Sequence, residues 1–301
     1  MTAGSLDRWA LGRTLTQLSN ASALDLARRP LRDPSAQPAR RIGITGAPGA
    51  GKSTLLGHLA LRRARHGCRV GVLAVDPSSP KSGGAILGDR VRIDELDGAA
   101  ELYIRSLGSR KTSDGLADNL PEMMDAMDDF GFVEVLLETV GVGQAEYAVR
   151  VQVDTLVLVL LPDSGDTVQA MKAGIMEMAD IFVVNKADLA GARKMATDIK
   201  RVAAISRHAE GAWVPPVLLT SASQPESIQT LSETIDRHQA WLTAEPRRQV
   251  LREQRARYRL RRLLEIRAAD VITRQDGAFF QAPLERQVTL ALALLSQPFA
   301  Q

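Results

Sequence analysis

One short segment limits the possible folds of this chain more than any other. Residues 46–53 read Gly-Ala-Pro-Gly-Ala-Gly-Lys-Ser and fit the pattern G-x-x-x-x-G-K-[ST], in which backbone N–H groups surround phosphate oxygens. An apolar run at 41–45 precedes the segment, and a helical pattern with Leu55, Leu56 and Leu59 along one side follows it. A strand, a glycine-rich turn and a helix N-terminus in this order place free N–H groups at a phosphate. The segment therefore predicts a phosphate-binding loop in an α/β fold.

The residues of this loop have distinct expected roles. Lys52 would reach the β- and γ-phosphates as a point charge, and the Ser53 hydroxyl would coordinate Mg²⁺. The alternative interpretation, a plain glycine-rich turn, does not account for the strand before the loop and the helix after it. The residues expected to bind nucleotide here are Gly46, Ala47, Pro48, Gly49, Ala50, Gly51, Lys52, Ser53 and Thr54.

From residue 41 onward, short β-rich runs alternate with helical patterns. This alternation is typical of βαβ units, which build a mostly parallel sheet. We therefore expect a P-loop NTPase domain at 39–240. The strands that the pattern predicts are 41–45, 69–75, 132–137, 154–161, 181–184 and 216–220.

The two ends of the chain have a different pattern. In the segment 1–38, Leu11, Leu15 and Leu18 recur at helical spacing, and a proline-rich stretch follows. This predicts an N-terminal helical extension and a linker. Beyond residue 240 the β pattern stops, and arginines and leucines alternate through 247–267. We expect a helical segment at 241–301, in which packing or dimer formation explains the arginines better than polyanion binding does.

A second motif follows the apolar run at 181–184. Asn185, Lys186 and Asp188 match N-K-x-D, a motif of guanine-nucleotide proteins. Asp188 can accept hydrogen bonds from the N1–H and the exocyclic amine of guanine, whereas adenine offers neither donor. Asn185 would brace the loop, and Lys186 would cover the plane of the base. The motif is weak alone, but downstream of a phosphate-binding loop it predicts guanine recognition.

A further element completes the expected base site. Ser221, Ala222 and Ser223 follow the apolar run at 217–219 and fit a short S-A element, whose backbone N–H meets guanine O6. The sequence thus predicts GTP and GDP as ligands. An acceptor that loses its paired contact when buried costs roughly 1–3 kcal/mol, and more when it is charged, which gives the site its selectivity.

Carboxylates between the two motifs are candidates for the metal and for catalysis. Glu138 and Gly141 match D-x-x-G with glutamate in place of aspartate, so Glu138 would hold Mg²⁺ through water and the Gly141 N–H would sense the γ-phosphate. Asp76 and Asp89 are candidates for the metal or for orienting the attacking water. The alternatives are that Asp76 caps a loop and Asp89 is only solvated. The water-positioning residue stays undecided at this point.

The residues expected to act in catalysis and those expected to bind Mg²⁺ overlap. The candidate catalytic residues are Lys52, Asp76, Asp89 and Glu138. The candidate Mg²⁺ ligands are Ser53, Asp76, Asp89 and Glu138.

Composition argues against several other classes of protein. The 38 basic and 35 acidic residues give a net charge of only +3, and aromatic residues make up 4%, so nucleic acid is not an expected partner. Cys68 is the one cysteine, which excludes an intrachain disulfide and favours a reducing compartment, the cytoplasm. The start of the chain lacks the apolar core of a secretion signal. The longest apolar run, 156–162, is shorter than the roughly 20 residues that span a bilayer, so no membrane segment is expected.

Histidine and methionine positions carry no further site. The four histidines lack metal-ligand spacing, and Met123, Met124 and Met127 on one helical segment are expected to pack in the core.

The segments GITGAPGAGKST, VLAVDPSSPKSGGAILGDRVRI, LLETVGVGQAE, GIMEMADIFVVNKADL and LLTSAS together resemble one family. In this order they are similar to the methylmalonyl-CoA mutase-associated GTPases, also called MeaB-like or ArgK-like GTPases. The resemblance covers about residues 40–225. It implies that Asp76, Asp89 and Glu138 are the Mg²⁺ and switch carboxylates, and that a mobile loop begins at 161–166.

The same resemblance implies a function and partners. The family is a homodimer, so the segment 241–301 would be a helical dimerisation arm. The implied activity is slow hydrolysis of GTP to GDP and phosphate. The implied role is to protect an adenosylcobalamin-dependent acyl-CoA mutase and to gate its cofactor loading. Which mutase is served stays open.

Three rival interpretations remain at this point. A metal-delivery GTPase would show histidine- or cysteine-rich chelating segments, which this sequence lacks. A GTPase of the signal-recognition type would carry a methionine-rich or membrane-facing domain. A nucleotide-dependent kinase of a basic-amino-acid transport system would transfer phosphate to a protein acceptor.

Overall fold

The computed structural model describes residues 5–30, 38–65, 67–77, 101–109, 116–117, 119–139, 145–162, 177–205, 211–243 and 247–297. Its centre is a seven-stranded sheet in which every neighbouring pair of strands is parallel, in the order β3-β2-β4-β1-β5-β6-β7. The strands are β1 (Arg40–Gly46), β2 (Val70–Pro77), β3 (Leu102–Ser109), β4 (Glu134–Glu138), β5 (Thr155–Leu160), β6 (Ile181–Val184) and β7 (Val217–Leu219). The expected α/β architecture is confirmed.

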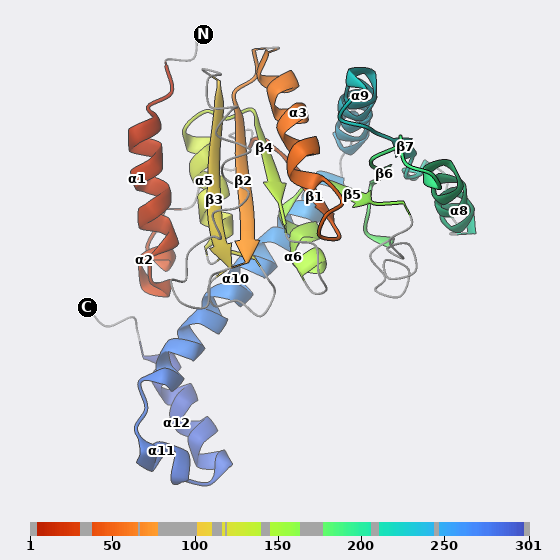
Figure 1. Ribbon diagram of the computed structural model, residues 1–301. Helices are drawn as coiled ribbons and strands as arrows, with labels where there is room; N and C mark the ends of the chain where they lie inside the picture. The colour runs from red at the N-terminus through yellow and green to blue at the C-terminus, as the bar shows by residue number, and fades with distance from the viewer. Residues whose placement is uncertain are drawn as a thin grey trace.

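Helices cover both faces of the sheet (Figure 1). The described helices are α1 (Arg8–Ser19), α2 (Ala23–Ala27), α3 (Lys52–Arg65), α5 (Leu120–Asp129), α6 (Ala145–Gln152), α8 (Ala192–Ile205), α9 (Pro225–Leu242), α10 (Arg247–Thr273), α11 (Gly277–Gln281) and α12 (Leu284–Ser296). One face packs against α3 and α9, and the opposite face packs against α1, α5, α6, α8 and the first half of α10.

Burial on both faces explains why the central strands are so apolar. In β5, Val157 and Val159 enter the core on the side of α3, whereas Leu156, Leu158 and Leu160 enter the cores on the other side. A strand covered on both faces has no solvated side, so it reads as a continuous apolar run. The apolar run was therefore the correct signal for these strands.

One strand was missed by the sequence analysis. β3 lies at the edge of the sheet, where only β2 pairs with it. Its middle residues, Ile104, Arg105 and Ser106, are only half-buried, and the Arg105 Nη2 donates to the Thr16 hydroxyl of α1 at 2.9 Å. The charged and polar residues at positions 105 and 106 interrupt the apolar run, and this interruption hides the strand in the sequence pattern.

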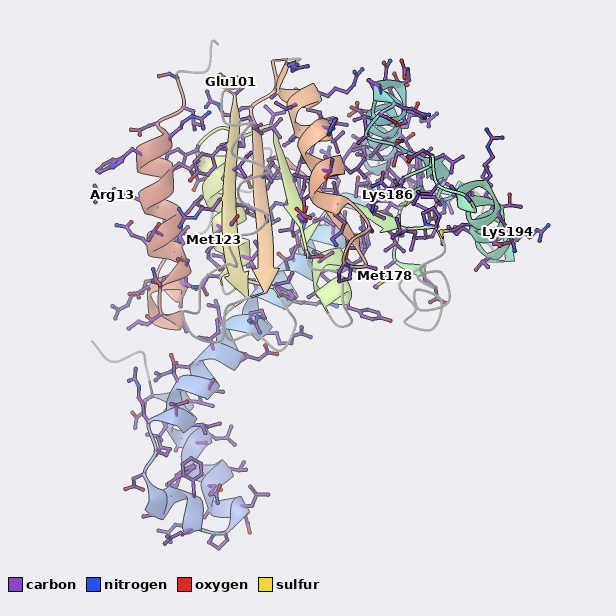
Figure 2. All side chains as sticks on the ribbon, in the orientation of Figure 1. Arg13, Glu101, Met123, Met178, Lys186 and Lys194 are labelled. Carbon is purple, nitrogen blue, oxygen red and sulfur yellow. The ribbon has the colours of Figure 1, made fainter. Side chains whose placement is uncertain are left out.

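The N-terminal helices form as their sequence predicts. The Asp7 side chain accepts from the Ala10 N–H at 2.8 Å and caps α1, and Ser22 and Asp25 form a reciprocal capping box at the start of α2. The three leucines expected on one face of α1 are all buried in the core, as are the three methionines of α5. Met123, which Figure 2 labels, is buried in the core that these residues form with the sheet.

The C-terminal segment is helical, as expected. α10 crosses one face of the sheet and continues past the carboxyl ends of β2 and β3 (Figure 1). There α11 and α12 fold back beside it. Two of its arginines pair with acids of the α/β part: Arg255 with Asp154 at 2.6 Å, and Arg259 with Glu122 at 2.8 Å. Within the described parts of the chain, no helix is both long and apolar enough to cross a bilayer.

Candidate functional site

The phosphate-binding loop connects β1 to α3 and depends on glycine at two positions. Gly46 has a φ of +143°, and a Cβ there would overlap the Val159 carbonyl oxygen of the neighbouring strand. Gly51 has a φ of +83°, and a Cβ there would lie 2.5 Å from the Asn185 Nδ2. Any other residue would be strained at both positions. The glycines thus let the loop pass close to β5 and to the loop that follows β6.

Lys52 lies at the start of α3 and folds back over the loop. Its Nζ donates to the Ala47 carbonyl oxygen at 3.0 Å, and the Ala50 N–H donates to the same oxygen at 3.2 Å. The Lys52 side chain is buried. Its positive charge therefore lies beside the first N–H groups of α3, which have no acceptor within the helix. Charge and N–H groups together make this end of α3 suited to an anionic group.

Glu138 is brought to the same helix end from β4. The register pairs Ile44 with Glu138, so the carboxylate lies beside the strand that leads into the loop. The Ser53 hydroxyl donates to Glu138 Oε1 at 2.7 Å. A hydroxyl and a carboxylate are oxygen ligands that Mg²⁺ prefers, so the donor set fits this ion.

The other expected metal and switch residues are placed only in part. Asp76 follows Val75 in β2, two residues beyond the level of Glu138, but its side chain is not described. Asp89 and Gly141 lie outside the described residues. The structure therefore brings together Lys52, Ser53 and Glu138.

Asn185 connects three loops at the carboxyl end of the sheet. Its Nδ2 donates to the Ala50 carbonyl oxygen at 2.8 Å, and its Oδ1 accepts from the Thr220 hydroxyl at 2.9 Å. The Ala187 N–H in turn donates to the Thr220 carbonyl oxygen at 2.9 Å. These contacts fix the phosphate loop, the loop after β6 and the loop after β7 to one another, and the Asn185 side chain is buried among them.

Asp188 is exposed and is oriented by hydroxyl groups. Its Oδ1 accepts from the Ser221 hydroxyl at 2.8 Å, and the Ser223 hydroxyl lies 2.9 Å from that of Ser221. The hydrogen bond from Ser221 holds the pKa of Asp188 below its usual value, with smaller contributions from its own N–H and from Lys186. Asp188 therefore stays an acceptor at neutral pH. Ala222 and Ser223 are exposed beside it.

Lys186 has a left-handed backbone, with a φ of +54°. Its side chain is exposed at the same end of the sheet as the phosphate loop (Figure 2). The turn at Lys186 separates Asn185, which points inward to Ala50, from Asp188, which is exposed. One loop thereby provides a buried structural amide and an exposed carboxylate.

Two threonines at this end of the sheet form a contact that the sequence motifs did not predict. The Thr139 hydroxyl donates to the Thr45 hydroxyl at 3.1 Å, and both side chains are buried. The signal available in the sequence was weak, since it consists only of a threonine at the end of each apolar strand.

The chain is similar to one family model and to several known proteins. A family model described as methylmalonyl Co-A mutase-associated GTPase MeaB matches residues 11–276. A probable GTPase of Mycobacterium tuberculosis is 41% identical over 246 residues, which are 79% of this chain and 73% of that protein. The GTPase ArgK of Escherichia coli is 38% identical over 231 residues, which are 75% and 69% of the two chains.

Two further similarities extend this result. The mouse protein named methylmalonic aciduria type A homolog, mitochondrial, is 38% identical over 207 residues, which are 68% of this chain and 50% of that protein. The crystal structure of a LAO/AO transport system kinase aligns with a TM-score of 0.61 and 24% identity, over 97% of this chain and 99% of that one. At this identity the structural likeness shows the fold.

Proposed function

This chain belongs to the family of methylmalonyl-CoA mutase-associated GTPases, and from that premise we propose that it uses GTP binding and hydrolysis to guard an adenosylcobalamin-dependent acyl-CoA mutase. The observation that supports the nucleotide part best is the position of Asn185. This residue joins Ala50 of the phosphate loop to Thr220 beside the base loop, so phosphate and base elements form one site.

The phosphate end of the site would bind the β- and γ-phosphates. Lys52 would exchange its bond to the Ala47 carbonyl for the phosphate oxygens and place its charge there. Ser53 and Glu138 would hold Mg²⁺, and Asp76 and Asp89 remain candidates for the same ion. When bound, Mg²⁺ neutralises charge that develops on the phosphoryl oxygens. Gly141 would sense the γ-phosphate.

The base end of the site would select guanine. The two oxygens of Asp188 can accept from N1–H and from the exocyclic amine, while Ser221 keeps the carboxylate ionised and oriented. Adenine has neither of these donors, so it leaves the carboxylate unpaired. A site built for a hydrogen-bond donor rejects an analogue that lacks it by orders of magnitude.

The partner part of the proposal rests on the family and on the C-terminal arm. α10 and α12 expose large apolar side chains, among them Leu260, Leu264 and Leu292. A second copy of the chain would cover such a surface, so we propose a homodimer with the arm 241–301 as its interface, the extension 1–38 and the GTPase domain 39–240. The cytoplasm is the compartment that we propose, because the one cysteine, Cys68, has no partner for an intrachain disulfide.

The alternative functions have weaker support. The matching family and the relatives from Mycobacterium tuberculosis and Escherichia coli are named GTPases, which does not favour a kinase of a basic-amino-acid transport system or a metal-delivery protein.

Guanine selectivity is tested by calorimetry with GDP and ADP in the presence of Mg²⁺. We expect ADP to bind at least about 100-fold more weakly, because only guanine pairs with Asp188. The variant Asp188→Asn offers a donor in place of an acceptor, so it should lose GDP affinity and gain affinity for xanthosine diphosphate. Asp198→Asn, at an exposed position on α8, is the matched control. Equal affinities of the unchanged protein for GDP and ADP would contradict the guanine assignment.

The role toward the mutase is tested by linkage. Affinities for GDP and for a non-hydrolysable GTP analogue are measured with and without a candidate mutase, and mutase binding is measured in each nucleotide state. A switch requires different affinities in the two states, typically about 5- to 150-fold, and the same factor must appear in both directions. Four identical affinities would exclude a switch function toward that mutase.

A further inference from the structure

Two buried hydroxyl groups lie where β1 and β4 end. Thr45 comes directly before Gly46, and Thr139 comes directly after Glu138. The Thr139 hydroxyl donates to the Thr45 hydroxyl at 3.1 Å, and the Thr139 N–H donates to the Ile44 carbonyl oxygen at 3.2 Å. Thr45 is 0% and Thr139 is 1% exposed. Valine would fill the same space without the cost of burying a hydroxyl, so this pair calls for an explanation.

The pair lies on the face of the sheet opposite to the metal ligands. Successive side chains of a strand point to opposite faces. Leu136 packs in the core beside α3, while Leu137 packs in the core on the other side. Glu138 therefore points toward α3, where it accepts from Ser53, and Thr139 points away from it.

The pair joins the two chain segments that carry the metal-facing oxygens. Ser53 follows β1 through the phosphate loop, and Glu138 ends β4. The regular register between β1 and β4 ends with Ile44 opposite Glu138. The two contacts of Thr139 extend this connection by one residue, to the point where both strands enter the nucleotide loops. The distance between the Ser53 hydroxyl and the Glu138 carboxylate thus depends on how firmly these two strand ends are held.

We propose that Thr45 and Thr139 are positioning residues for Mg²⁺: their hydroxyl pair holds Glu138 in place beside Ser53 and so sets the affinity of the site for the ion. This inference rests on the proposed nucleotide function. The two threonines touch neither nucleotide nor metal, and they act through the carboxylate of Glu138.

The test compares Thr45→Val, Thr139→Val, the double valine variant and Thr139→Ser. Mg²⁺ is titrated into each protein loaded with a fluorescent GDP analogue, and GDP affinity is measured separately in EDTA. We expect each single valine to weaken Mg²⁺ affinity by about 3- to 10-fold, the range that one neutral hydrogen bond provides. GDP affinity in EDTA should stay unchanged. Thr139→Ser keeps the hydroxyl and should keep the Mg²⁺ affinity of the unchanged protein.

Thr155→Val is the matched control. Thr155 is a fully buried threonine at the opposite end of the sheet, where its hydroxyl bonds to His238 and Gln239. The Thr155→Val variant should be less stable to urea and should keep the Mg²⁺ affinity of the unchanged protein. The double valine variant should show less than the sum of the two single effects, since the two hydroxyls share one hydrogen bond.

Three outcomes would overturn the inference. The first is unchanged Mg²⁺ affinity in both single valine variants, which would make the pair purely structural. The second is a Thr139→Ser variant that weakens Mg²⁺ binding as much as Thr139→Val, since the hydroxyl would then be irrelevant. In the third, the unchanged protein binds no GDP at all, and this result would overturn the proposed function as well.

Discussion

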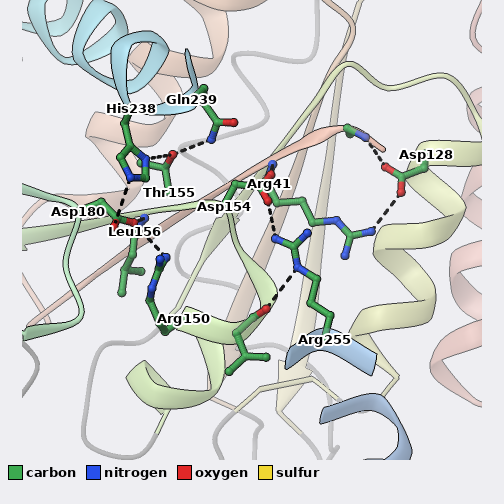
Figure 3. A network of polar contacts seen from close by, with 12 residues as sticks. Arg41, Asp128, Arg150, Asp154, Thr155, Leu156, Asp180, His238, Gln239 and Arg255 are labelled. Carbon is green, nitrogen blue, oxygen red and sulfur yellow. Dashed lines mark hydrogen bonds and ion pairs between the residues drawn. The ribbon is translucent and has the colours of Figure 1, made fainter. Parts of the chain in front are cut away.

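The two ends of the central sheet are held together by different chemistry. At the carboxyl end of the strands, neutral groups make the connections: the Asn185 amide, the Thr220 hydroxyl and the Ala50 carbonyl oxygen. At the amino end, charged groups pair with one another. Arg41 Nη2 lies 3.0 Å from Asp125 and 3.1 Å from Asp128, and Arg255 bonds to Asp154. Figure 3 shows the contacts of Arg41 with Asp128 and of Arg255 with Asp154.

The difference follows from what each end must do. At the carboxyl end, Lys52 donates to the Ala47 carbonyl oxygen and Asp188 accepts from the Ser221 hydroxyl. At the amino end, Arg41 and Arg255 pair with carboxylates. Burial alone would lower the pKa of Arg41, but Asp128, Asp125 and Asp154 raise it above its ordinary value. We therefore propose that charged groups serve ligand binding at the carboxyl end and structure at the amino end.

The largest effect is expected at the carboxyl end. Lys52→Ala removes the positive charge that we propose for the β- and γ-phosphates and should lower GTP hydrolysis by at least about 1,000-fold, with little change in stability to urea. A phosphate-release assay measures the first quantity and denaturation the second. Lys200→Ala, at an exposed position on α8, should retain both. Loss of stability in parallel with activity would remove the distinction between the two ends.

The opposite pattern is expected for Arg41→Met. This change leaves Asp128 buried with fewer partners and should cost about 3–5 kcal/mol in free energy of unfolding. GDP affinity of the folded protein should stay close to that of the unchanged chain. Arg201→Met removes an exposed pair with Asp198 and serves as the control. A GDP affinity that falls while stability holds would contradict our assignment of Arg41 to structure.

A smaller and more local effect is expected for Arg255→Met. The variant loses a contact to Asp154 at 2.6 Å and one to the Val151 carbonyl oxygen at 3.3 Å, together about 1–3 kcal/mol. Because α10 provides the arginine, hydrogen exchange should accelerate in 247–273 more than in the sheet. Uniform acceleration across the chain would show that the pair supports the whole fold instead.

The smallest effect is expected at the exposed pair of Arg261 and Glu265. Arg261→Ala removes an ion pair at 3.4 Å one helical turn apart and should change stability by at most about 0.5 kcal/mol. Denaturation at low and high salt measures it. A loss above 1 kcal/mol would mean that exposed pairs of α10 matter as much as the buried ones.

The sequence predicted those features that are written in contiguous residues. Strands buried on both faces appear as apolar runs, and the loops after β1, β6 and β7 appear as short motifs beside them. β3 was missed because an edge strand with Arg105 and Ser106 in its middle lacks such a run. Local pattern predicts local structure well when burial is uniform along the element.

Contacts between distant residues could not be predicted in the same way. Thr45 and Thr139 are 94 positions apart, and Arg41 and Asp154 are 113 positions apart. Whether such residues meet depends on strand order and register, and a shift of one residue would turn each side chain to the other face. The motif residues need no such knowledge, because each motif lies within one loop.

α10 also has a mechanical consequence. Its 27 residues form a continuous rod of about 40 Å. Arg255 and Arg259 anchor its first half, and α11 and α12 lie beside its far end. The part of the helix beyond the anchor acts as a lever: a rotation of about 10° at the anchor would displace its far end by about 4–5 Å. The anchor lies against α6, the helix that follows Gly141 in the chain. Small movements at the anchor are thus easiest to detect at the far end of α10, for example with a pair of fluorescent labels.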